Sequence, residues 1–301
     1  MPPYPIQLFL KSSLVFALVF FFTAAPGQIS HGGRPLPLSA GMGARSLGTT
    51  GDLFVEMPSF DGQAALRQTQ QDQTDLKSLE FAHKFDVHLR PDNSGIMFTS
   101  GGMNVWRVGI RSRGAYSLNL LFSKFRLPEG AKLFVYNAEQ TEILGSYTHE
   151  NNTNLNLLPV QPIGGEELIV EYQVPRDAVD KGEIEIGEVN HDFVGIFRAT
   201  EPRDPLQSCH PNLVCYPEDI QPGGGVVALI INGTTYCTGA LVNNTAEDGT
   251  PYLLTATHCL NNDYDANFLA NRRYDIIAGS IVAFFNYQSP LCNTNIRGPL
   301  Q

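Results

Sequence analysis

The strongest chemical signal in the sequence is a histidine followed by a cysteine, His258-Cys259, at the end of the apolar run 252–256. An earlier apolar run begins at Cys237, and the turn-rich residues 245–251 separate the two runs. Two such runs predict a β-hairpin, which a bond between the two cysteines can close in an oxidising compartment. His258 then lies at a strand end, where a rigid scaffold commonly holds catalytic groups. Imidazole suits proton transfer because its unperturbed pKa is near neutrality.

The N-terminus predicts export from the cell. Lys11 precedes a short apolar run, residues 14–22, and small residues follow as far as Gly27. The run is too short to span a bilayer, so we predict a signal peptide over residues 1–27, cleaved before Gln28. An uncleaved anchor is the alternative. We expect a secreted protein, periplasmic or extracellular, with no membrane association after signal cleavage.

The cysteines are confined to the last third of the chain. They are Cys209, Cys215, Cys237, Cys259 and Cys292. In an exported protein this clustering indicates a disulfide-stapled module, and an odd number leaves one thiol without a partner. A zinc site is the alternative, since His210 and His258 each adjoin a cysteine. The C-x5-C spacing is not that of a zinc ribbon or knuckle, so we predict no metal and no other cofactor.

A resemblance to a known family rests on two segments. C-T-G-A-L-V-N-N at 237–244 and L-L-T-A-T-H-C at 253–259 resemble the histidine region of trypsin-like serine proteases, and most of all the lysyl endopeptidase branch. The resemblance covers roughly residues 204–301. It implies that His258 is the general base, which takes a proton from a serine hydroxyl and returns it to the leaving amine.

The same resemblance implies a disulfide pattern. The family's pairs correspond to Cys237–Cys259 and Cys215–Cys292 in this sequence. Cys209 corresponds to a residue whose partner lies far downstream in the family, so we expect Cys209 to be unpaired in this chain. The Cys237–Cys259 bond would hold the hairpin beside His258.

The other two members of a Ser-His-Asp triad are not evident. Asp263 and Asp265 follow His258 too closely, and Asp275 comes before the next expected strand. Ser280 follows a glycine but enters a strand, and no G-D-S-G-G or G-x-S-x-G sequence occurs in the 301 residues. We name none of these as catalytic and expect the chain as given to be inactive, because the nucleophile is missing.

The middle of the chain predicts a β-sandwich over residues 76–200. Alternating apolar runs, separated by turn residues, occur at 85–89, 104–110, 116–122, 133–136, 167–172 and 184–189. This region resembles the β-sandwich pro-region that precedes the protease domain in secreted bacterial endopeptidases of the lysyl endopeptidase branch. His191-Asp192 is not expected to act as a dyad, because adjacent strand residues point to opposite faces.

The segments on either side complete the predicted organisation. Residues 28–75 are rich in Gly, Ser, Pro and Gln, so we predict a flexible linker. Residues 199–207 carry prolines around Arg203 and are expected to be a second linker and a site of proteolysis. Further strands at 226–231 and 281–287 flank the His258 hairpin, and residues 204–301 resemble an incomplete first β-barrel of the chymotrypsin fold.

The predicted fold class is therefore all-β: an antiparallel β-sandwich pro-domain followed by an incomplete protease barrel. The formal net charge of −10 argues against nucleic acid as a partner. The first functional hypothesis is a secreted serine endopeptidase precursor, whose complete enzyme would hydrolyse a peptide or protein substrate. The second is a non-catalytic exported protein whose β-sandwich binds a partner or glycan and whose tail is a protease remnant.

Overall fold

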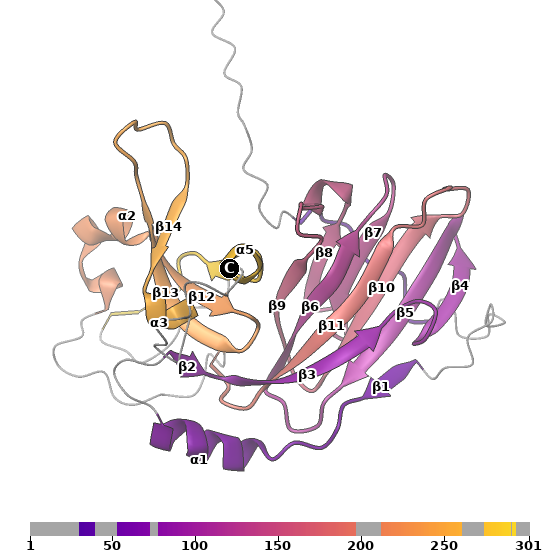
Figure 1. The fold of residues 1–301 in the computed structure, drawn as a ribbon, viewed down its shortest axis with the longest axis horizontal. Helices are drawn as coiled ribbons and strands as arrows, with labels where there is room; N and C mark the ends of the chain where they lie inside the picture. The colour runs from indigo at the N-terminus through magenta and orange to yellow at the C-terminus, as the bar shows by residue number, and fades with distance from the viewer. Residues whose placement is uncertain are drawn as a thin grey trace, which may run out of the picture.

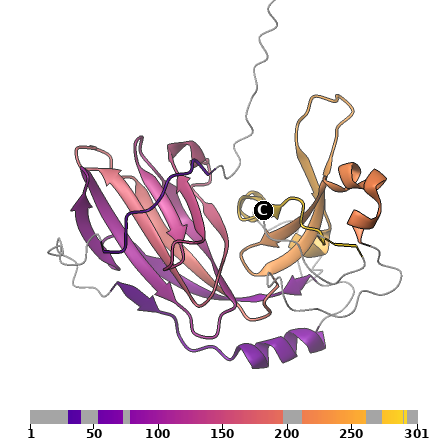
Figure 2. The same ribbon diagram turned by 180° about the vertical axis from the view of Figure 1, so that it is seen from behind.

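The computed structural model describes residues 30–39, 53–72, 78–196, 212–260, 274–289 and 291–292. The described chain is built mainly from β-strands in three sheets, with few and short helices, so the all-β prediction is confirmed. Figures 1 and 2 show two bodies side by side, a large sandwich and a smaller unit that ends in a projecting hairpin. Within the described residues, no helix has the length and apolarity needed to cross a membrane.

The first sheet forms one layer of the sandwich. Its strands are β1 (Phe54–Glu56), β4 (Ile96–Ser100), β5 (Met103–Arg111), β7 (Lys132–Tyr136), β8 (Ile143–Tyr147) and β10 (Glu167–Pro175). They lie in the order β1-β5-β10-β7-β8, with β4 also paired to β5. The pairs are antiparallel except for β1, which runs parallel to β5. The register of β5 and β10 places Arg107 directly opposite Glu171.

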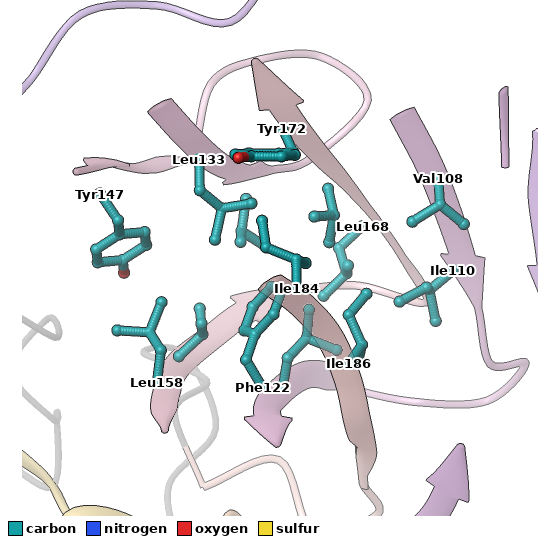
Figure 3. Packing of buried hydrophobic residues seen from close by; sticks show 14 of the residues in the cluster. Val108, Ile110, Phe122, Leu133, Tyr147, Leu158, Leu168, Tyr172, Ile184 and Ile186 are labelled. Carbon is teal, nitrogen blue, oxygen red and sulfur yellow. The ribbon is translucent and has the colours of Figure 1, made fainter. Parts of the chain in front are cut away.

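The second sheet forms the facing layer. Its strands are β3 (Ala82–Leu89), β6 (Ser117–Arg126), β9 (Leu158–Gly164) and β11 (Glu183–Asp192), in the order β3-β11-β6-β9. Alternating residues of both sheets turn inward, and Figure 3 shows the labelled side chains pointing toward one another between the layers. Val108, Phe122 and Ile186 in this cluster have no solvent exposure. Each fully buried side chain of this kind stabilises the fold by about 1.5–3 kcal/mol.

The outer face of the first sheet is covered by residues 30–39. Pro35 is buried, and Leu36 N donates to Glu171 Oε1 at 2.9 Å. Arg107 Nη2 donates to the carbonyl oxygens of Leu36 at 3.2 Å and Pro37 at 3.3 Å. The buried Arg107 and Glu171 need polar partners, and the backbone of this segment supplies them. The expected flexible linker over residues 28–75 is therefore wrong for residues 30–39.

A helix also lies within the expected linker. α1 (Gly62–Asp72) lies entirely within residues 28–75, so the expected flexible linker is also wrong for this segment. Asp61 caps its first turn, because Asp61 Oδ1 accepts a hydrogen bond from Ala64 N at 2.9 Å. In Figure 1 α1 lies beneath the smaller unit, and β1 precedes it on the edge of the sandwich.

The third sheet forms the smaller unit. Its strands are β2 (Leu79–Glu80), β12 (Val226–Ile231), β13 (Thr235–Val242), β14 (Tyr252–Thr255) and β15 (Val282–Phe284). The order is β14-β13-β12-β15, with β2 added to β13, and in the described part this sheet is open rather than closed into a barrel. β2 thus pairs outside the sandwich, although its residues fall in the range expected for the sandwich. The expected strand over 281–287 is shorter, because only 282–284 pair with β12.

Short helices lie between strands in both the sandwich and the smaller unit. They are η1 (His149–Asn151), η2 (Leu213–Cys215), η3 (Pro217–Asp219), α2 (Ile220–Gly223), α3 (Thr257–Leu260) and α5 (Tyr274–Gly279). α3 follows β14 directly and carries the His258-Cys259 pair.

Candidate functional site

His258 is positioned by the hairpin of β13 and β14. The two strands pair in register from Val242↔Tyr252 to Gly239↔Thr255, and α3 begins two residues after the last pair. His258 is half-buried in this single turn of helix. Its carbonyl oxygen accepts a hydrogen bond from Ser78 Oγ at 3.3 Å, so a residue beside β2 also contacts the turn.

A disulfide fixes the turn to the hairpin. Cys237 in β13 and Cys259 in α3 are bonded, with their Cα atoms 5.9 Å apart and both residues buried. This separation lies in the range that disulfides require. The two sulfurs and a ring nitrogen of His258 lie within 4.8 Å of one another. The imidazole is thus held against the disulfide that the sequence resemblance implied.

The same three residues do not fit a metal ion while the disulfide is intact. Zinc binds cysteine as a thiolate, and both sulfurs here are joined to each other. Only His258 remains as a ligand in this group, and one imidazole does not make a zinc site.

The second disulfide joins the two ends of the smaller unit. Cys215 at the end of η2 is bonded to Cys292, 77 residues later, with the Cα atoms 5.0 Å apart. This is the other pairing that the resemblance implied. Cys209 lies outside the described residues, so its expected lack of a partner stays a prediction.

Of the remaining candidates, the structure describes only Asp275 and Ser280. Asp263 and Asp265 lie outside the described residues, and Asp275 lies in the first turn of α5. Ser280 is buried, with Oγ 2.7 Å from Ile277 O and 2.7 Å from Asn232 Oδ1. These hydrogen bonds hold the turn after α5 in place, and they leave the Ser280 hydroxyl unavailable as a nucleophile.

The sandwich contains a serine–histidine contact that sequence reasoning missed. Ser112 Oγ lies 2.7 Å from His191 Nδ1, and both residues are buried. Burial lowers the pKa of His191 to about 4, with His83 acting in the same direction, so this imidazole is neutral at pH 7. The ring of Phe60 packs against both histidines, with centroids 4.2 Å from His83 and 5.2 Å from His191. The contact is therefore closed to a substrate.

Asp192 does not share this contact. Its Oδ2 accepts from Ser117 Oγ at 2.8 Å, and its Oδ1 accepts from Val194 N and Gly195 N. His191 and Asp192 thus have different serine partners, as expected from the alternation of side chains along a strand.

One family comparison bears on the site. Residues 205–299 match the family model described as lysyl endopeptidase, C-terminal domain. No solved structure matches the chain. The matched range contains both disulfides and His258, and these features are compatible with an extracellular protein. Over residues 205–299, this protein is related to the lysyl endopeptidases, and its smaller unit is protease-related.

Proposed function

We propose that this protein is the precursor form of a secreted serine endopeptidase of the lysyl endopeptidase type. Residues 1–27 are the signal peptide, residues 76–200 the β-sandwich pro-domain, and residues 204–301 the first part of the protease domain. The observation that carries the proposal is the family match over residues 205–299, which includes a histidine held against a disulfide.

In this proposal His258 is the general base. It accepts the proton of a serine hydroxyl as that oxygen attacks a peptide carbonyl, and it then donates the proton to the leaving amine. The hairpin and the Cys237–Cys259 bond hold the imidazole in place for this transfer. The serine and the orienting aspartate are not supplied by these 301 residues, so we expect no peptidase activity from this chain alone.

The test is a peptidase assay of the purified, oxidised chain with lysyl and arginyl amide substrates. The expected result is no turnover in either the unmodified chain or the His258→Ala variant. Turnover in the unmodified chain that is lost in His258→Ala would contradict the expected inactivity while keeping the role of His258. Equal turnover in both would point to a contaminating protease.

A second candidate function is favoured by a cavity in the sandwich. It has a volume of about 740 Å³ and lies at one end of the two layers. Met97, Trp106, Tyr172 and Ile184 line its apolar part, and its rim includes Lys124. This arrangement supports a non-catalytic exported protein that binds a partner or glycan through the sandwich.

The two functions are separated by a binding experiment. Peptide and glycan arrays would be probed with the unmodified chain and with Met97→Trp, whose larger side chain is placed to fill the cavity. A ligand bound by the first protein and lost in the second supports the binding function. Equal binding by both would exclude this cavity as the site.

A further inference from the structure

The sandwich and the protease-related unit are joined by a pair of strands and by an apolar cluster to which both parts contribute residues. β2 pairs with β13 through Leu79↔Tyr236 and Glu80↔Thr235, and β3 of the sandwich begins two residues after β2. Phe81, between the two strands, bonds in both directions: its N–H donates to Thr234 O at 2.9 Å, and its carbonyl accepts from Phe193 N at 3.0 Å. A single residue therefore belongs to the backbone networks of both parts.

An apolar cluster surrounds this residue. Phe81, Ala82 and Ile196 have no solvent exposure and pack with Ile230 and Phe284 of the third sheet. Without the sandwich side, one face of β12 and β15 would be exposed to water, because the residues that cover it come from 79–82 and 194–196. The smaller unit thus depends on the sandwich for part of its core.

A polar contact adds specificity to the interface. Asn119 Nδ2 donates to Gly233 O at 2.9 Å, and Asn119 Oδ1 accepts from Asn190 Nδ2 at 2.9 Å. Gly233 has φ +71°, and a Cβ added there would lie 2.1 Å from Asn190 Nδ2. Only glycine fits this turn against the two buried asparagines. Gly279 lies nearby, since its neighbour Ser280 is hydrogen-bonded to Asn232, and a Cβ added to Gly279 would lie 2.5 Å from Leu155 Cδ1.

We infer that residues 78–196 are a specific binding partner for residues 212–292, able to hold them after the chain between the two parts is cut. The inference rests on the proposed function, a precursor, together with the site of proteolysis that the sequence predicts around Arg203. Residues 79–82, together with the sandwich from which they extend, pack on the surface formed by β13, β12 and β15. Cutting alone therefore leaves a non-covalent complex, in which β2 remains paired to β13 beside the His258 turn.

Disulfides cannot account for such a complex. All five cysteines follow residue 208, so none lies in the sandwich. Retention after a cut before Leu206 would depend on the interface described above.

The test uses the full chain with a recognition sequence for a site-specific protease inserted between Pro202 and Leu206. The oxidised protein is cut and its mass measured by size-exclusion chromatography with light scattering, over a dilution series. The expected result is one species containing both fragments. Separate elution of two soluble fragments at every concentration would overturn the inference.

Two glycine variants identify the surface. In Gly233→Ala the added methyl group meets Asn190, and we expect the dissociation constant of the cut complex to rise by about tenfold or more. Gly249→Ala is the matched control, because Gly249 also has positive φ, +75°, but an added Cβ meets nothing within 4 Å. Equal dissociation constants for the two variants would overturn the proposed surface. The readout is mass, so it does not depend on peptidase activity or on the proposed catalytic role of His258.

Discussion

His191 makes the stability of the sandwich depend on pH. Burial holds the pKa of this histidine at about 4, against 6.5 for an exposed one; His83 adds to the lowering and Glu166 opposes it. Between pH 4 and pH 6.5, His191 is therefore protonated in the unfolded chain but neutral in the folded chain. The contribution of His191 to the free energy of unfolding is highest above pH 6.5, and we expect this contribution to fall by roughly 2–3 kcal/mol between pH 7 and pH 4.

The measurement is urea unfolding at pH 7, 5.5 and 4 for the unmodified chain and for His191→Gln. The variant lacks the titrating ring, so its free energy of unfolding should fall less over this range. Carboxylates such as Glu185, whose pKa is lowered to about 2 chiefly by its hydrogen bond to His88, contribute equally to both proteins. The same pH dependence in both proteins would show that His191 is not its source.

A second prediction at this scale concerns the buried ion pair of the first sheet. Arg107 Nη2 lies 2.6 Å from Glu171 Oε2, and the two side chains are 1% and 0% exposed. Replacing Arg107 with Met leaves a buried carboxylate without its cation and should reduce the free energy of unfolding by about 3–5 kcal/mol. The control is Arg126→Met, which removes an exposed pair with Asp180 and should cost less than about 1 kcal/mol. Chemical denaturation at pH 7 compares the variants; equal losses would contradict this difference.

Among the structural elements, the hairpin and the ends of the smaller unit are each held by a disulfide. On a chain-entropy estimate, Cys237→Ser/Cys259→Ser should lose about 3 kcal/mol and Cys215→Ser/Cys292→Ser about 4 kcal/mol. The second loss is larger because Cys215 and Cys292 are 77 residues apart, whereas Cys237 and Cys259 are 22 residues apart. Guanidinium unfolding monitored by circular dichroism gives both values. A hairpin variant as stable as the unmodified chain would show that this bond does not constrain the unfolded state as expected.

The projecting hairpin is the element most prone to self-association. Leu254 in β14 is 62% exposed, and Leu241 and Tyr252 beside it are also exposed. An exposed apolar strand at the edge of a sheet favours pairing with another chain. We expect Leu254→Lys to reduce the light scattering of concentrated protein. Val179→Lys, at a fully exposed sandwich residue, is the matched control and should change little.

The strands that the sequence predicts well are those with clear alternation. β3, β5, β7, β10 and β11 each contain a run identified from the period of two, and β6 contains all but the first residue of its run, 116–122. β8 and β9 were missed because glycine, proline or polar residues interrupt their apolar pattern, and β4 was missed because its three apolar residues are consecutive and do not alternate. β2 has two residues and forms only because β13 presents an edge to it, which is a non-local effect. The prediction of a flexible linker was wrong for residues 30–39, because hydrogen bonds between their backbone and the distant residues Arg107 and Glu171 hold them in place.

For the whole molecule, the sequence locates the site better than it locates the contact between the two parts. The segments around His258 predicted the hairpin, because the residues that form it are close in the sequence. The two cysteine pairs were implied by the family resemblance, and Cys215–Cys292, 77 residues apart, has no local signal. The shared core around Phe81 was not predictable, since its members come from residues 79–82, 194–196, 228–236 and 282–287. No single one of these four segments carries a sequence pattern that predicts their packing together.

The protease assignment is tested most directly by sequencing the transcript that encodes these residues, read past the codon for Gln301. The account predicts a reading frame that continues into an aspartate-bearing loop and a G-x-S-G sequence, which would supply the aspartate and serine that act with His258. A stop codon at this point, with neither sequence downstream, would contradict the protease precursor and favour an exported binding protein.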